Sequence, residues 1–406
     1  MFDNDLQTIY NIHRDTKEKN CDLYLYFCEY IGGNFMIIGV PTEIKNNENR
    51  VSATPGAVSE FVKNNHEVYV QKGAGLGSGI TDEEFVEAGA TILDTAEEVW
   101  EKAELIYKVK EPIESEYKYF KEGQIIYTYL HLSADPELTK HLVEKKVTGI
   151  AFETVQKGRL LPLLKPMSEV AGRMAVQEGA KFLLKTNGGK GKLLNGVPGV
   201  APAYVVVIGA GTVGSAATKI AVGMGARVKV LDVNVEALAR LEEIHGSKIE
   251  TEYSNPLNIE KAVKDADLVV STVLIPGRKA PQLVKEYMVE EMEAGSVIVD
   301  VAIDQGGSTD LTKGHPTTHD EPTFVEHDVI HYSVANMPGA AALTSTYALS
   351  NATTRYGVQI ANLGALEAAK KFPELIPGIN THDGYVTLEG VADDLGYEYK
   401  DLGLDK

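Results

Sequence analysis

An apolar run followed by three regularly spaced glycines constrains this chain more than any other feature. Residues 205–208 read Val-Val-Val-Ile, and Gly209, Gly211 and Gly214 follow in the spacing G-x-G-x-x-G where a helical stretch opens. In such a unit the first glycine permits a tight turn, the second lets the backbone approach a pyrophosphate, and the third allows close helix packing. The helix N-terminus favours the phosphate charge. The run therefore predicts a dinucleotide-binding unit.

A second apolar strand indicates which dinucleotide binds. Residues 228–231 form this strand, which ends in Asp232, 21 residues after Gly211. A carboxylate at this place accepts hydrogen bonds from the adenine ribose and repels a 2′-phosphate. We therefore predict NAD rather than NADP as the cofactor.

Short apolar strands alternate with amphipathic helices along most of the chain. One series begins with a strand at residues 37–40, and a second runs from residue 204 to residue 334. Such alternation predicts an α/β fold with two Rossmann-like domains, each a mostly parallel sheet covered by helices. Two long helical patterns flank the second series, at residues 168–185, with Ser168 as the N-cap, and at residues 345–371.

These flanking helices suggest where the domains divide. We expect residues 167–341 to form the NAD-binding domain, and residues 36–166 together with 342–406 to form a discontinuous second domain that binds the substrate.

The first 35 residues differ in composition from the rest. They contain both cysteines and seven of the 30 aromatic residues. The codons of Gly32 and Gly33 can form a purine-rich ribosome-binding sequence a short distance before Met36. We expect native translation to start at Met36, which makes residues 1–35 a non-native extension. A genuine, poorly ordered extension is the alternative.

Composition excludes several classes of protein. The chain has 39 Lys and Arg residues against 58 Asp and Glu residues, a formal charge of −19, so it offers no basic surface for nucleic acid. Residues 193–218 and 329–354 lack charges, but prolines and glycines interrupt both stretches, which argues against membrane helices. Two cysteines cannot form a disulfide scaffold, and the chain opens with no signal-peptide pattern. We expect a cytoplasmic protein without membrane or nucleic-acid partners.

Several polar residues fall where the predicted strands end. Lys108 and Lys110 close one strand, His131 lies near the end of another, Asp304 follows a third, and Arg50 lies in a polar loop. Each alone has a plainer explanation, since lysines and arginines are usually solvated and a histidine in an apolar run is often a structural residue. Together they could bind a carboxylate substrate and move protons. The sequence contains no serine-hydrolase elbow, no H-E-x-x-H motif and no cysteine cluster, so no metal site is expected.

Six runs in a fixed order resemble the bacterial alanine dehydrogenase family, to which NAD(P) transhydrogenase subunits are related. The resemblance extends from Met36 to about Asp401. The runs are IGVPTEIKNNENRV at residues 38–51, KVKEP at 108–112, YLHL at 129–132, PMSEVAGR at 166–173, DQGG at 304–307 and ANMP at 335–338.

The resemblance implies reversible oxidative deamination of L-alanine by NAD⁺ to pyruvate, ammonium and NADH. It also implies a homohexamer. Substrate-carboxylate binding falls to Arg50 and Lys110, and proton transfer to His131 and Asp304. By the same matching, the residues that contact the cofactor include Ser168, Ser254 and Asn336.

The chain departs from the family pattern at two places, and three other functions stay open. Residues 341–343 read Ala-Ala-Leu where the family usually has a proline and a basic residue, and Gly314-His315 replaces a usual arginine. The main alternative is a soluble transhydrogenase-like subunit, which needs no amino-acid chemistry. A saccharopine dehydrogenase, with a larger substrate pocket, and a non-catalytic NAD-sensing module are the others.

Overall fold

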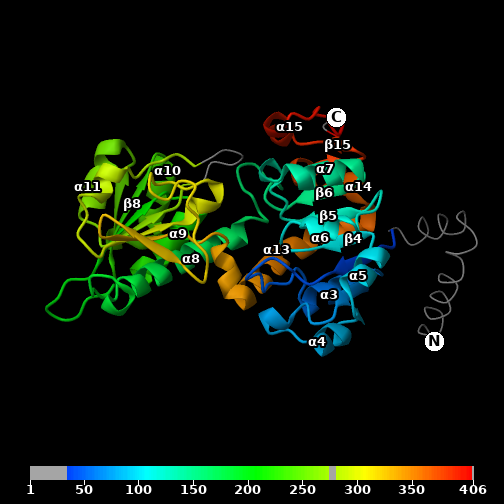
Figure 1. Ribbon diagram of the computed structural model, residues 1–406, viewed down its shortest axis with the longest axis horizontal. Coiled ribbons are helices and arrows are strands. Elements are labelled where there is room, and N and C mark those ends of the chain that lie inside the picture. Colours follow the sequence, from blue (N-terminus) through cyan, green and yellow to red (C-terminus); the bar gives the residue numbers. More distant parts are fainter. Residues whose placement is uncertain (1–33, 274–279, 405–406) are drawn as a thin grey trace, which may run out of the picture. The chain divides into compact units, whose positions relative to one another are not determined.

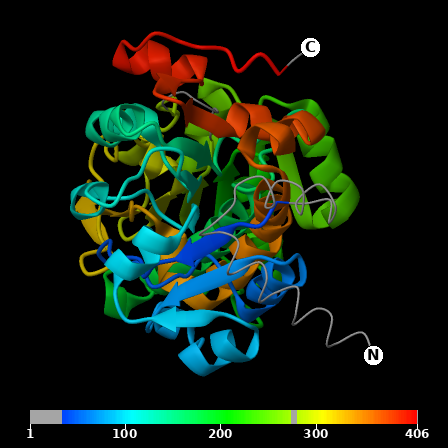
Figure 2. The same cartoon turned by 90° about the vertical axis from the view of Figure 1, so that its right-hand side faces the viewer.

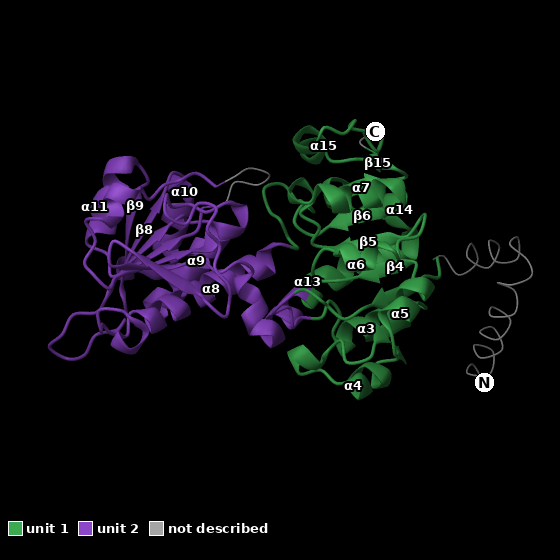
Figure 3. Ribbon diagram, in the orientation of Figure 1, with its two compact units in different colours: residues 1–45, 51–163, 350–406 green, residues 46–50, 164–349 purple. Residues whose placement is uncertain are grey.

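The computed structural model describes residues 34–273 and 280–404 (Figure 1). The chain divides into two compact units, coloured in Figure 3. Unit 1 contains the described residues up to Lys45, residues 51–163 and the chain from Ser350 onward, and unit 2 contains residues 46–50 and 164–349. The prediction that residues 1–35 are a non-native extension concerns a segment of which only residues 34 and 35 are described.

Unit 1 is built on a sheet of eight strands with the order β15-β14-β6-β5-β4-β1-β2-β3. Strands β1 to β6 are parallel, and β1 and β2 are the neighbouring blue strands of Figure 2. The last two strands of the chain extend the sheet in antiparallel orientation. The bounds are β1 Ile37–Val40, β2 Glu67–Gln71, β3 Thr91–Leu93, β4 Leu105–Tyr107, β5 Ile125–Thr128, β6 Thr148–Ala151, β14 Ile379–His382 and β15 Tyr385–Val386.

Local sequence signals explain where the helices of unit 1 begin. Thr81 and Thr95 each form a capping box with a glutamate three residues later, and Thr54 caps a helix whose first residue is Pro55. Both faces of the sheet are covered, since Trp100 and Leu142 pack on one face and the Tyr127 hydroxyl donates to a helix backbone on the other. The helices are α3 Pro55–Lys63, α4 Asp82–Glu87, α5 Ala96–Lys102, α6 Glu114–Tyr117, α7 Pro136–Glu144, α14 Ala365–Lys371 and α15 Glu389–Leu395, with the second half of α13 Ala342–Leu363.

Unit 2 repeats the plan with a sheet of seven strands in the order β12-β13-β11-β10-β7-β8-β9. All are parallel except β12, which pairs antiparallel with β13. The strands are β7 Tyr204–Ile208, β8 Arg227–Asp232, β9 Ile249–Tyr253, β10 Leu268–Ser271, β11 Val297–Asp300, β12 Thr323–Glu326 and β13 Val329–Tyr332; the helices are α8 Lys165–Phe182, α9 Thr212–Gly223, α10 Val235–His245, α11 Pro256–Lys264 and α12 Glu286–Val289.

Alternate residues of the unit 2 strands enter two separate cores. Val205 and Val207 pack in a cluster with side chains of α8, α9 and α10, whereas Val206 and Ile208 pack with side chains of α11 and α12. A strand buried on both faces must be apolar at every position, which explains the unbroken Val-Val-Val-Ile run. In both units the six parallel strands have the relative order 3-2-1-4-5-6, the doubly wound Rossmann arrangement. The predicted fold class is confirmed.

The predicted bounds of several elements are wrong. Helix α8 begins at Lys165 rather than at a Ser168 cap, because Pro166 suits a first helical turn. The single helix expected at residues 345–371 is two helices, since Gly364 breaks it with a φ of +77°. Strands β4 and β5 end at Tyr107 and Thr128, so Lys110 and His131 lie in loops.

Among the described residues, no helix combines the length and the apolar composition that crossing a bilayer requires.

A buried ion cluster holds the loop that follows β4. Lys108 is 1% exposed, and its Nζ lies 2.7 Å from Glu116 Oε1 and 3.4 Å from Glu43 Oε2. Glu43 also accepts the backbone N–H of Val109 at 2.6 Å, and Glu116 accepts that of Ile113 at 3.0 Å. Burial alone would lower the pKa of Lys108, but the two carboxylates outweigh burial and raise the pKa above its ordinary 10.5. Lys108 is therefore a structural cation.

We expect Lys108→Met to destabilise unit 1, because it leaves two buried carboxylates without their cation. Breaking such a pair costs about 3–5 kcal/mol, roughly 10 °C in melting temperature for a unit of this size. Because the pKa of Lys108 is higher in the folded than in the unfolded protein, the lysine contributes its full stabilisation at pH values below the unfolded pKa of about 10.4. This contribution to the free energy of unfolding is lost as the pH rises through the higher folded pKa. The deficit of the variant should thus be constant from neutral pH to about pH 10. Calorimetry measures it, with Lys63→Met, at an exposed pair with Glu60, as control. Equal melting temperatures would refute the structural role.

Candidate active site

The glycine turn of unit 2 has the geometry that its spacing predicts. Gly209 has a φ of +108°, and a Cβ at Gly214 would lie 1.8 Å from the Gly209 carbonyl oxygen, so neither position accepts a side chain. A Cβ at Gly211 would meet nothing within 4 Å. Gly211 is also the N-cap of α9, a helix of 12 residues. The open side of the turn therefore faces the N-terminal N–H groups of α9, as a pyrophosphate site requires.

Asp232 lies beside this turn, at the end of β8. Its Oδ2 accepts the N–H of Ala210 at 2.5 Å and its Oδ1 accepts that of Asn234 at 2.7 Å. The N–H of Ser254, which follows β9, donates to the Asp232 carbonyl at 3.0 Å. The carboxylate thus fixes the glycine turn. Together with the open position at Gly211, this arrangement fits a dinucleotide.

A second cluster in unit 2 joins three of the predicted residues. The backbone N–H of Asn336 donates to Asp304 at 3.2 Å from Oδ1, and the Asn336 Oδ1 accepts from Arg50 Nη2 at 2.8 Å. Asn336 is held in the left-handed region, with a φ of +57°, which asparagine tolerates better than most residues. Glu48 completes the cluster, because it accepts from Arg50 Nε at 2.6 Å and from Asn336 Nδ2 at 2.9 Å.

Arg50 is buried rather than solvated. The residue is 2% exposed, and its fork contacts both oxygens of Glu48. Burial would raise the pKa of Glu48, but the hydrogen bond and charge of Arg50, with the Asn336 hydrogen bond, outweigh burial and lower the pKa. Arg50 is therefore a fixed cation in a defined orientation: its Nε and Nη2 atoms hold the Glu48 carboxylate, and its Nη1 lies 3.1 Å from the Met167 sulfur.

His131 occupies a loop of unit 1 in a strained conformation. It follows β5 with a φ of +50°, and its side chain is 44% exposed, so it is not a core histidine. Glu153, which follows β6, accepts the N–H of His131 at 2.6 Å and that of Leu130 at 3.2 Å. The His131 ring lies nearly parallel to the Tyr129 ring, with 5.9 Å between centroids. A non-glycine residue held in this region by its surroundings is often found at functional sites.

Lys110 and His131 share an electrostatic partner. Burial would raise the pKa of Glu111, but the charges of Lys110, Lys45 and His131 act on it, and the pKa is lowered. Lys45 also forms an ion pair with Glu111. Unit 1 thus gathers a lysine and an imidazole around one carboxylate, at the carboxyl ends of β4 and β5.

The predicted residues therefore fall into three groups. In unit 2, Arg50, Asp304 and Asn336 lie together. Also in unit 2, the three glycines, Asp232 and Ser254 surround the start of α9. In unit 1, His131 and Lys110 lie near Glu111. Ser168 belongs to none of these contacts, since it lies half-buried inside α8 and its N–H bonds to Leu164.

Sequence reasoning missed the carboxylates that orient these groups, namely Glu48, Glu111 and Glu153. Glu48 and Glu111 stand in polar runs rich in charge, where nothing marks one residue as buried. Glu153 had a usable signal, because it follows a short apolar strand, β6, whose carboxyl end lies at the same edge of the sheet as that of β5.

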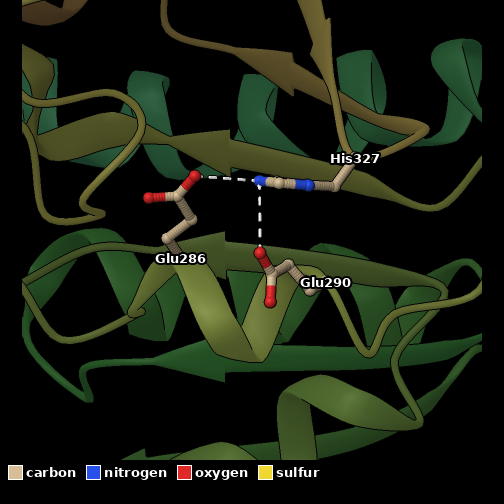
Figure 4. Close-up of side chains that lie close together, drawn as sticks. All are labelled: Glu286, Glu290 and His327. Atoms are coloured by element: carbon tan, nitrogen blue, oxygen red, sulfur yellow. Dashed lines mark hydrogen bonds and ion pairs between the residues drawn. The ribbon is translucent and has the colours of Figure 1, made fainter.

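A further polar group lies away from these clusters (Figure 4). His327 Nε2 lies 3.0 Å from Glu286 Oε1 and 3.9 Å from Glu290 Oε1. The hydrogen bond to Glu286 and the nearby carboxylates raise the pKa of His327. Among the described residues no other set of three such side chains converges in this way, but all three residues are exposed and the ion pair itself explains their proximity.

Comparisons with known proteins agree with these observations. Residues 39–171 match the N-terminal domain of the alanine dehydrogenase/PNT family, and residues 175–389 match its C-terminal domain. The chain is 60% identical to an alanine dehydrogenase of Methanococcus maripaludis, over 91% of this chain and all of that protein. It is 58% identical to an alanine dehydrogenase of Bacillus subtilis, over 90% of this chain and 96% of that protein.

A solved structure agrees as well. An L-alanine dehydrogenase superimposes with a TM-score of 0.86 at 47% identity, covering 89% of this chain and 99% of that one. The resemblance predicted from the six sequence runs is confirmed: the chain belongs to the alanine dehydrogenase/PNT family.

Proposed function

We propose that the protein is an NAD-dependent L-alanine dehydrogenase that interconverts L-alanine and pyruvate, with release or uptake of ammonium. The observation that carries this proposal is the identity of 58–60% over nearly the full length of proteins named alanine dehydrogenase. The buried Arg50 beside Asn336 and Asp304 supports it, because an amino-acid substrate presents a carboxylate and a transferable proton.

NAD is held, in this proposal, by the residues around the start of α9. Gly211 would let the pyrophosphate approach the helix N-terminus, Asp232 and Ser254 would bind the adenine ribose, and Asn336 and Ser168 would contact the rest of the cofactor. Bound there, NAD⁺ would supply the acceptor for the hydride of the substrate Cα–H bond. Residues 167–341 thus serve NAD, and residues 36–166 with 342–406 serve the substrate.

Four side chains act on the substrate. Arg50 and Lys110 bind the carboxylate and fix the orientation of the Cα–H bond, since positioning of this kind can supply several kcal/mol of the barrier reduction. His131 accepts a proton from the water that attacks the imino carbon, and Asp304 assists proton transfer. The exposed ring of His131 and its fixed backbone suit a residue that must exchange protons with solvent.

The proposal is tested by mixing the purified protein with L-alanine and NAD⁺ and recording NADH absorbance. Activity with alanine supports it, whereas NADH binding without turnover supports the transhydrogenase-like subunit. We further propose that the enzyme is a cytoplasmic homohexamer, as the family resemblance implies; sedimentation analysis measures the oligomer.

Removal of the imidazole tests the role of His131. We expect His131→Ala to lower kcat by about 10²–10⁴, because general acid–base catalysis contributes on that scale. NADH binding, by fluorescence titration, and melting temperature should stay close to wild type, since the side chain is 44% exposed. His141→Ala, at a half-buried histidine of α7, is the control. A folded His131→Ala enzyme that keeps more than about a tenth of wild-type kcat would exclude His131 from the mechanism.

Cofactor choice is tested at Asp232. Asp232→Ala removes a charge-assisted hydrogen bond to the ribose worth roughly 1.5–3 kcal/mol, so the NAD KM should rise tenfold or more. The use of NADP should rise relative to NAD, because the repulsion of a 2′-phosphate is lost. Steady-state kinetics with both cofactors measure the change. Asp265→Ala, at an exposed carboxylate after α11, should alter neither KM. Equal use of both cofactors by the unmodified enzyme would contradict the assignment.

A further inference from the structure

Asp300 is a fully buried carboxylate that the mechanism above does not use. It is the last residue of β11 and is 0% exposed. Its Oδ1 accepts from the N–H of Ala302 at 3.0 Å and from the hydroxyl of Ser308 at 2.7 Å. Its Oδ2 accepts from the N–H of Ser308 at 2.7 Å and from the hydroxyl of Thr312. These donors are neutral groups, and all belong to the segment that follows the strand.

That segment is a compact loop organised around the carboxylate. Residues 301–305 form a short 3-10 helix that Asp300 caps, and Gly306 and Gly307 then reverse the chain with φ values of +94° and +83°. Ser308 and Thr312 are also 0% exposed. Because the carboxylate contacts the loop at its start, its middle and its end, it fixes the path of everything between.

Asp304 lies on this loop and differs sharply from Asp300. It is exposed, and its carboxylate accepts the N–H of Asn336, which in turn binds Arg50. The proposed proton-transfer residue therefore sits on a short helix whose N-cap is a buried anion. The position of Asp304 relative to Asn336 depends on that anchor.

Asparagine cannot replace aspartate in this network. Each oxygen of Asp300 accepts one backbone N–H and one hydroxyl. In either orientation, an asparagine amide would turn its NH₂ group toward a backbone N–H that cannot rotate away. Burying the charge of Asp300 costs free energy, and the hydrogen bonds that both carboxylate oxygens accept offset that cost. Both oxygens are therefore needed as acceptors.

We infer that Asp300 is a positioning residue, which fixes the loop so that Asp304 is held in its reactive place. This inference rests on the proposed function, in which Asp304 takes part in proton transfer. Asp300 itself touches no substrate and acts only through Asp304.

A double-mutant cycle in the full-length enzyme tests the inference. We expect Asp304→Asn to lower kcat by about 10²-fold or more. Asp300→Asn should lower kcat by about 10- to 100-fold, since misplacement of a reacting group by about 1 Å costs on that scale. KM for alanine and the Kd for NADH should change by less than about threefold. In the Asp304→Asn background, Asp300→Asn should lower kcat by less than about threefold, because its target is already lost.

The matched control is Asp267→Asn. Asp267 is also buried, at 2% exposed, but it precedes β10 at the opposite edge of the same sheet and is paired with Lys190 and Lys192. This variant should lower the melting temperature and leave kcat within about twofold of wild type. If Asp300→Asn fails to fold, Thr312→Val tests the inference instead. This variant removes one hydrogen-bond donor to Asp300 and keeps the carboxylate. It should lower kcat without a matching loss of NADH binding.

The outcomes separate the inference from the function on which it rests. An equal loss of kcat from Asp300→Asn in both backgrounds, or no loss in either, overturns the positioning role while the role of Asp304 stands. A parallel fall of kcat, NADH affinity and melting temperature also overturns it, because Asp300 is then merely structural. Full activity of Asp304→Asn removes the role of Asp304 and the inference with it.

Discussion

The parallel pairing of strands decides where chemistry can occur in this protein. In both units six strands run in the same direction, so their carboxyl ends meet at one edge of each sheet. Every strand must then be connected by a crossover, and the loops that leave this edge are free to carry polar residues. Arg50 and Lys110 follow β1 and β4, and Asp232 and Asp304 follow β8 and β11. The sheet topology therefore determines where the candidate residues lie as much as the sequence motifs do.

The fold was predictable because burial on both faces leaves a strong signature. The run at residues 205–208 is apolar at every position, since alternate side chains enter two different cores. Two of the strands that escaped prediction, β3 and β9, are half-exposed edge strands without that signature. Strand β6, Thr148–Ala151, also escaped prediction although it is buried at all four positions, because its sequence Thr-Gly-Ile-Ala is not an unbroken apolar run. The break at Gly364 was also missed, because a glycine is tolerated inside many helices and only its φ of +77° shows that the helix stops.

The candidate site was predictable only where a residue type is rare in its setting. A histidine or an arginine near a strand end stands out, and so do three spaced glycines. The carboxylates that orient them do not, because glutamate is common in polar loops. Glu48 lies two residues before Arg50, yet only the folded chain shows that both are buried and that Asn336, nearly 290 residues later, joins them. Contacts of this kind depend on tertiary packing that no local pattern encodes.

Buried charge is the means by which these loops are fixed. Lys108 with two glutamates and Arg50 with Glu48 join residues from different segments of the chain, whereas Asp300 binds several neutral donors of one loop. An apolar residue of similar volume would avoid the cost of desolvation, and buried ion pairs often contribute little net stability. Apolar contacts, however, are not directional, so a hydrophobic side chain tolerates small shifts of its neighbours. A carboxylate that accepts four hydrogen bonds does not tolerate such shifts, because each bond depends on distance and angle. Catalytic groups on loops need that direction, since a displacement of about 1 Å can cost a factor of about 10² in rate. The buried ions therefore fix the paths of the loops that carry the candidate residues, at a cost in desolvation that an apolar residue would avoid.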